Sequence, residues 1–226
     1  MHYIKSLIFI IFYLCCPVLL AQDNIQSLGE TAVSINHKVS QTYSINFAAR
    51  SRYFLYRDNA VQYQQQQIDV FHFSTFSLNY NHKLSFGVYY RHRDWFKSGD
   101  NEIRFTQQFN YTKQKLGVRY GHRFRTEQRI LNTNTIYRQR YRFAVDFPLN
   151  GEKLDISEAY LVSAVESLLS LSEGIKPETD IRLSSQIGWQ ITEQLKLQTG
   201  LEYRLEAFNV NTSHQLFLLT TGILKI

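Results

Sequence analysis

Apolar and polar side chains alternate along most of this chain with a period of two, which is the period of a β-strand. In one segment Leu84, Phe86 and Val88 share a face, while Arg91 and Arg93 lie on the opposite face. The stretch KLGVRYGHRFRTEQ (115–128) has the same pattern, with arginines on one face and apolar or aromatic side chains on the other. The chain is therefore predicted to form a sheet with one apolar and one charged face.

Clusters of Asn, Asp, Gly, Lys and Ser divide this pattern into eleven predicted strands. They span residues 29–38, 42–55, 66–81, 83–96, 101–112, 115–128, 134–148, 153–169, 179–191, 195–208 and 213–226. The stretch SEAYLVSAVESLLSLSEG contains the helix-favouring residues Ala, Leu and Glu. We interpret it as a strand, because it follows the turn-like PLNGEK and strand-like segments flank it.

The N-terminus carries the features of a secretory signal. Lys5 precedes an apolar run from Leu7 to Leu14, and Pro17 and Ala21 follow it. The run is shorter than the roughly 20 residues that a membrane-spanning helix needs. We therefore expect a signal peptide at 1–21 and one domain at 22–226. Both cysteines fall within the signal peptide, so a disulfide or a thiolate metal site is not expected in the exported chain.

Two all-β architectures fit the alternation. A β-sandwich would bury its apolar faces between two sheets, whereas a transmembrane barrel would turn them toward lipid and its charged faces toward the lumen. Short links such as 81–83, 113–115 and 192–194 alternate with longer ones such as 56–64 and 170–180, as in outer-membrane barrels. Aromatic residues near strand ends fit interfacial girdles: Tyr80, Trp95, Phe96, Tyr111, Tyr137, Phe147, Trp189 and Phe208.

These features favour a single antiparallel transmembrane β-barrel of 10 to 12 strands in the outer membrane of a Gram-negative bacterium. The eleven segments conflict with the even strand number expected of a bacterial barrel. Either ten strands from residue 42 onward form the wall and 22–40 is an additional edge strand, or a twelfth strand exists. The last strand is expected to run toward the short-turn, periplasmic end.

Several segments carry a resemblance to a known family. They are RQRYRFAVDFPL (138–149), YLVSAVESLL (160–169), DIRLSSQIGWQITEQLKLQTGLEYR (180–204) and the hairpin SINHKVSQTYSINFAARSRY (34–53). From about residue 27 to its end, the chain resembles the outer-membrane barrels of domain-of-unknown-function family 2490. The resemblance implies the barrel fold. It implies no activity, because none is established for that family.

The charged face supplies the candidate site, a lumenal charge network. The predicted members are Arg50, Arg91, Arg104, Arg119, Arg123, Arg138, Arg140, Arg142, Glu158, Glu166, Arg182, Glu202 and Arg204. Charges withdrawn from water must be paired and hydrogen-bonded, so a salt-bridged plug is one interpretation. The other is a basic path for anions, because arginines outnumber carboxylates and the guanidinium fork suits oxyanions.

Other functions are less well supported by the sequence. The period of a barrel wall and the export signal argue against nucleic-acid binding, despite a pI of about 9.2. His72 and Ser74 share a strand face, as do Ser184 and Gln186, so a lipid-modifying enzyme is the alternative function. His82, His92 and His122 form no recognisable metal set, and no cofactor is expected.

We therefore expect a non-enzymatic, porin-like outer-membrane protein, either structural or a narrow conduit for small solutes, including anions. The expected partners are outer-membrane lipid and the barrel-assembly machinery. The sequence does not indicate an oligomeric state.

Overall fold

The computed structural model describes residues 25–93 and 101–226, all of which are strands, turns or irregular connections. The predicted signal peptide and Trp95 and Phe96 lie outside the described residues. The strands are β1 (Ile25–Lys38), β2 (Tyr43–Arg57), β3 (Ala60–Ser77), β4 (His82–Arg93), β5 (Glu102–Lys115), β6 (Val118–Ile130), β7 (Thr135–Pro148), β8 (Ala159–Ser172), β9 (Ile175–Gln190), β10 (Leu195–Glu206) and β11 (Ser213–Lys225). Within the described residues, no helix is long and apolar enough to cross a membrane.

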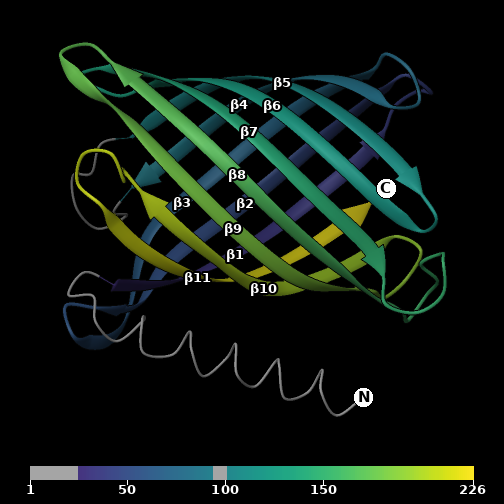
Figure 1. The fold of residues 1–226 in the computed structure, drawn as a ribbon. Helices are drawn as coiled ribbons and strands as arrows, with labels where there is room; N and C mark the ends of the chain where they lie inside the picture. Colours follow the sequence, from purple (N-terminus) through teal and green to yellow (C-terminus); the bar gives the residue numbers. More distant parts are fainter. Residues whose placement is uncertain (1–24, 94–100) are drawn as a thin grey trace.

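The eleven strands close into one barrel, in which every strand pairs with its neighbours in sequence and β1 pairs with β11. Figure 1 shows the strands tilted around the barrel, with β1 beside β11. All consecutive pairings are antiparallel, but β1 and β11 are parallel, from Ile25 beside His214 to Asn36 beside Lys225. The all-β barrel is confirmed.

The expectation of an even strand number is wrong for this chain. An up-and-down barrel with an odd number of strands has first and last strands that run in the same direction, so a parallel ladder closes it. That ladder satisfies both edges as an antiparallel one would. The segment 22–40 is thus not an additional edge strand, because its residues from Ile25 to Lys38 form β1 in the wall.

The two ends of the barrel can be named by the chain. The amino end is where β1 and β11 begin, and the carboxyl end is where both strands end (Figure 1).

The predicted alternation of short and long connections is not observed. The expected loops at 56–64 and 170–180 are two-residue turns at 58–59 and 173–174. Asp58 and Asn59 both have positive φ, 51° and 59°, which fits the tight turns that let strands continue without a loop.

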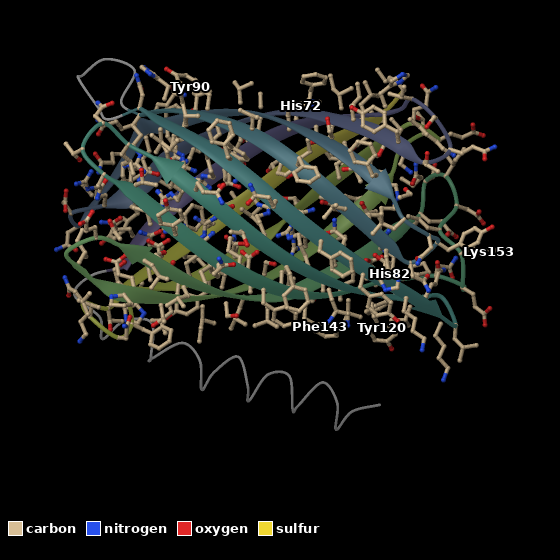
Figure 2. All side chains as sticks on the ribbon, turned by 90° about the horizontal axis from the view of Figure 1, so that it is seen from above. His72, His82, Tyr90, Tyr120, Phe143 and Lys153 are labelled. Carbon is tan, nitrogen blue, oxygen red and sulfur yellow. The ribbon has the colours of Figure 1, made fainter. Side chains whose placement is uncertain are left out.

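The longest connection between described strands, 149–158, lies at the carboxyl end, where the short turns were expected. Figure 2 shows Lys153 in this connection, beyond the end of the wall. The connection lengths therefore do not identify the periplasmic end.

The two faces of the wall have opposite chemistry. Apolar side chains on the outer face remain about half exposed, among them Val33 (54%), Phe124 (53%) and Leu201 (52%). The side chains of Asp69 and Glu127 on the inner face are fully buried. In Figure 2 the labelled His72, Tyr90, Tyr120 and Phe143 project outward, whereas side chains rich in nitrogen and oxygen fill the interior.

One part of the lumen is apolar and lies beside the parallel seam. Leu28, Phe54, Phe217 and Leu219 form a buried cluster contributed by β1, β2 and β11. The guanidinium of Arg204 lies 3.7 Å from the ring centroid of Phe217, a cation–π contact that links this cluster to the charged part of the lumen.

Candidate functional site: a charged lumen

The lumen contains a cavity of about 850 Å³ whose lining comes from both ends of the barrel. Arg119, near the start of β6, lies at the carboxyl end of the barrel, and Arg129, near the end of the same strand, lies at the amino end of the barrel; both line the cavity. Gln215 and Thr221 do the same from the two halves of β11. The cavity therefore follows the length of the barrel and does not form a side pocket.

The strand period places the arginines in this cavity. On β7 every second residue from Arg138 to Arg142 points inward, and on β6 Arg123 and Arg125 do the same. The register sets Arg123 directly opposite Arg142, and Arg125 opposite Arg140. Like charges in directly opposed positions are destabilising, so the arrangement needs anionic groups nearby.

Toward the amino end these groups are present. We call this set the amino-end network: Asp69, Arg91, Arg93, Glu102, Arg104, Glu127 and Arg129. The carboxylate of Glu102 accepts hydrogen bonds from Arg129 at 2.7 and 3.0 Å and from Arg104 at 2.6 and 3.0 Å. Arg93 is the third arginine that donates to this carboxylate, at 3.1 Å.

The other two carboxylates of the network are paired in the same way. The two oxygens of Asp69 accept bonds from Nε and Nη2 of Arg91 at 2.7 and 3.0 Å. Glu127 accepts hydrogen bonds from Arg140 at 2.9 Å and from Arg104 at 3.3 Å. All three carboxylate side chains are fully buried. Buried charges are destabilising unless they are paired, and each of these three has arginine partners.

A second set lies beside the apolar cluster. Glu30 on β1 is within ion-pair distance of Arg50 (3.4 Å), Arg52 (2.8 Å) and Arg204 (3.7 Å). Arg204 also donates to Glu202 at 2.5 Å. Sequence reasoning did not include Glu30, because it treated the first strand as a possible addition outside the wall.

The middle of the lumen is different. We call the group formed by Arg123, Arg140, Arg142, Glu166 and Arg182 the Glu166 cluster. Glu166 accepts bonds from Arg123 at 3.0 Å and Arg140 at 2.6 Å. Arg182 has one long contact, to Glu206 at 3.5 Å.

Arg142 lines the cavity and has no hydrogen bond or ion pair within 4.0 Å to any residue that the structure describes. Among the same residues, the Nε atoms of Arg123, Arg140 and Arg182 are buried and lack an acceptor. The cluster thus has more donors than its single carboxylate can satisfy.

The structure places twelve of the thirteen predicted network residues on the wall of this cavity. Glu158 is the exception, and the prediction for it is wrong. Strand β8 begins only at Ala159, so Glu158 lies in the preceding connection. Its carboxylate accepts bonds from Asn150 Nδ2 (3.1 Å) and the backbone N–H of Asp155 (3.0 Å).

Two predicted arginines have individual partners. Arg138 donates to Ser170 Oγ at 2.8 Å, and Arg119 pairs with Asp146 at 2.9 Å near the carboxyl end, where it is half exposed. Sequence reasoning also missed Asp69, Glu102, Glu127 and Arg129. Glu102 alternates in phase with Arg104, and Glu127 with Arg125 and Arg129, which is a signal that could have identified these two carboxylates.

The His72 and Ser74 pair lies on the outer face. Nε2 of His72 is 3.1 Å from Ser74 Oγ, which is 3.0 Å from the hydroxyl of Tyr43. Two other outward histidines are paired similarly, His122 with Tyr141 (2.9 Å) and His214 with Tyr203 (2.6 Å). In the described part of the chain, no group of three or more His, Cys, Asp or Glu could hold a metal ion.

Comparison with known proteins gives one family match. A family model described as "Protein of unknown function (DUF2490)" matches residues 31–215, which confirms the suspected resemblance. A search of curated proteins finds no match.

Two solved structures are distantly similar to this chain. LpxR from Salmonella typhimurium is 8% identical, with a TM-score of 0.49 over 80% of this chain and 83% of its own. The siderophore receptor PirA from Pseudomonas aeruginosa is 10% identical, with a TM-score of 0.31. The match covers 80% of this chain but 34% of that receptor. These likenesses are too distant to support an argument about function.

Proposed function

The chain belongs to the DUF2490 family of proteins of unknown function, and we propose that it is a non-enzymatic outer-membrane barrel whose lumen conducts small anions. The observation that carries this proposal is the cavity, which has lining residues at both ends of the barrel and an excess of arginine.

The outer face supports a location in the membrane. Every strand of the barrel has large apolar side chains exposed on this face, which would be unfavourable in water and is favourable in lipid. Tyr90 and Tyr137 lie near the amino end, and Tyr120 lies near the carboxyl end, as expected for interfacial aromatic residues. Polar outward side chains such as Gln107 and Gln128 bond each other at 3.0 and 3.2 Å, which reduces the cost of placing them in lipid.

The lumen supports passage of anions. Among the described residues, fourteen arginines and four glutamates line the cavity. The buried carboxylates of Asp69, Glu102 and Glu127 add three negative charges behind this lining, so the wall stays positive. A ring of positive charge around a water-accessible path favours anions over cations.

Reconstitution tests both parts of the proposal. The folded protein should migrate differently on a gel before and after boiling, and should enter the outer membrane only when the barrel-assembly machinery is present. In planar bilayers under a KCl gradient, the reversal potential should have the sign of a chloride-selective path. A monodisperse protein that stays soluble without detergent would contradict the membrane location. Cation selectivity, or no conductance at all, would contradict the conduit and leave a structural role.

The contact between His72 and Ser74 favours a second candidate, a lipid-modifying enzyme. A histidine 3.1 Å from a serine hydroxyl can act as its general base, and the pair faces outward. However, Nδ1 of His72 has no hydrogen-bond partner among the described residues, so the orienting third group of a triad is missing. Mass spectrometry of envelope lipids should give the same profile for the wild type and Ser74→Ala, and a changed profile would favour the enzyme.

A further inference from the structure

All members of the Glu166 cluster except Arg140 belong to a row of residues that the sheet register places side by side. Arg123 on β6 is paired with Arg142 on β7, Arg142 with Glu166 on β8, and Glu166 with Arg182 on β9. Arg182 is in turn paired with Arg204 on β10. Five adjacent strands thus contribute four guanidinium groups and one carboxylate to one level of the inner wall.

The single carboxylate of this row is already in use. One oxygen of Glu166 accepts from Arg123, and the other accepts from Arg140, which lies outside the row. Arg204 has its own partners in Glu202 and Glu30. Arg142 and Arg182 therefore flank Glu166 without either being bound to it at ion-pair distance.

The donors left over all belong to the cavity wall. They are the guanidinium of Arg142, which has no hydrogen bond or ion pair among the described residues, and the buried Nε atoms of Arg123, Arg140 and Arg182, which have no acceptor there. Buried donors without acceptors are costly, and two like charges directly opposite each other add repulsion. An anion that binds between these groups would remove both costs.

We propose that the Glu166 cluster is a binding site for oxyanions of the phosphate class that carry two or more negative charges. Several guanidinium groups from different strands can donate to several oxygens of one such anion, which chloride cannot match. Ser184 and Gln186, which line the same cavity on the strand of Arg182, can bond the rest of a larger solute. The proposal deepens the proposed passage, since it names the class of solute that would be held there.

Isothermal titration calorimetry on the folded protein in detergent, in a chloride buffer without phosphate, tests the site. Inorganic phosphate and pyrophosphate are the probes, and pyrophosphate should bind more tightly because it carries more charge. Arg142→Gln should weaken pyrophosphate binding roughly 10- to 100-fold, the effect of losing a charged hydrogen bond. Glu166→Gln should strengthen it, because the competing carboxylate is gone.

Arg57→Gln is the matched control, because Arg57 pairs with Asp58 beside a turn and does not line the cavity. It should leave the affinity unchanged. If Arg142→Gln does not give the heat-modifiable band of a folded barrel, Arg182→Gln takes its place. No heat with the wild type, or equal affinities for the wild type and the lumenal variant, would overturn the proposal.

The passage and the site can fail separately. Chloride conductance without pyrophosphate binding would leave the conduit and remove the site. Pyrophosphate binding without conductance would support the site and remove the conduit.

Discussion

The amino-end network and the Glu166 cluster are built from the same residue types on neighbouring strands, yet they differ in charge balance. In the amino-end network, three buried carboxylates each contact one or more arginines at 2.6 to 3.4 Å. The Glu166 cluster has one carboxylate among four arginines; Glu166 contacts Arg123 and Arg140, and Arg142 has no ion pair among the described residues. The position of carboxylates, more than that of arginines, thus separates the fully paired part of the lumen from the part that we propose binds a solute.

The two regions also differ in contact with water. The arginines of both regions line the cavity, but the carboxylates of the amino-end network have no exposed side-chain surface, whereas the Glu166 side chain is 9% exposed and lines the cavity itself. In the first region, removal of Glu102 would leave Arg104 and Arg129, whose side chains are 6% and 8% exposed, without the carboxylate that they share. In the second region, water or an anion can take the place of the lost group.

The largest effect is expected at Glu102, which contacts Arg91, Arg93, Arg104 and Arg129. Glu102→Gln should lower the free energy of unfolding by roughly 3 to 5 kcal/mol, the cost of breaking a buried ion pair by removing one partner. Urea unfolding in detergent, followed by heat modifiability on gels, measures the change. Glu193→Gln in the exposed β9–β10 turn is the control and should unfold like the wild type.

Glu166→Gln should have a smaller effect, a loss of roughly 1 to 3 kcal/mol, because cavity water can solvate Arg123 and Arg140 in place of the carboxylate. The same variant should shift the reversal potential further toward chloride. If its unfolding midpoint fell as far as that of Glu102→Gln, the two regions would not differ as described, and the lumen would be a plug throughout.

Arg142→Glu should change stability by less than about 1 kcal/mol, because it replaces an unpaired cation with a carboxylate beside Arg123 and Arg182. It should also remove the chloride preference of the reconstituted protein. The charge reversal Arg57→Glu outside the lumen is the comparison in the same bilayer assay. A large loss of stability in Arg142→Glu would mean that Arg142 has a structural partner.

The smallest effect is expected from salt alone. Screening shortens from about 10 Å at 0.1 M to about 3 Å at 1 M ionic strength, and it acts on charges that water reaches. The chloride preference should therefore decline at high KCl, while the unfolding midpoint set by the amino-end network should stay nearly constant. If the chloride preference and the unfolding midpoint changed equally with salt, water would reach the amino-end network as well as the Glu166 cluster.

The sequence predicts much of this lumen and misses its pairing. Strand period alone assigns Arg138, Arg140 and Arg142 to one face, because alternation needs no knowledge of neighbouring strands. Which carboxylate meets which arginine depends on register, so the pairing of Glu102 with Arg129 could not be inferred. Glu158 was misplaced because a strand boundary was set six residues too early, at 153 and not at Ala159.

The connections and the closure were harder still. The polar residues around Asp58 and Asn59 are typical of a loop, but both residues adopt positive φ and the strands continue on either side. The eleven strands predicted from the sequence are the number observed. The expected even number came from other bacterial barrels and does not apply to this chain. No local pattern in the sequence distinguishes a parallel closing ladder from an antiparallel one.

The parallel seam between β1 and β11 bears on how this barrel could be re-engineered. In a barrel with an even number of strands, the first and last strands meet as a hairpin would, and a short linker can join them for circular permutation. Here Ile25 lies at the amino end and Lys225 at the carboxyl end, with a ladder from Ile25 to Asn36 between them. At about 3.3 Å per residue, a linker would have to span the full height of the wall. A circular permutant with new termini in the 58–59 turn would thus need a long polar linker from the end of β11 to the start of β1. Removing one strand would give an even number of strands, and the first and last strands would then be antiparallel.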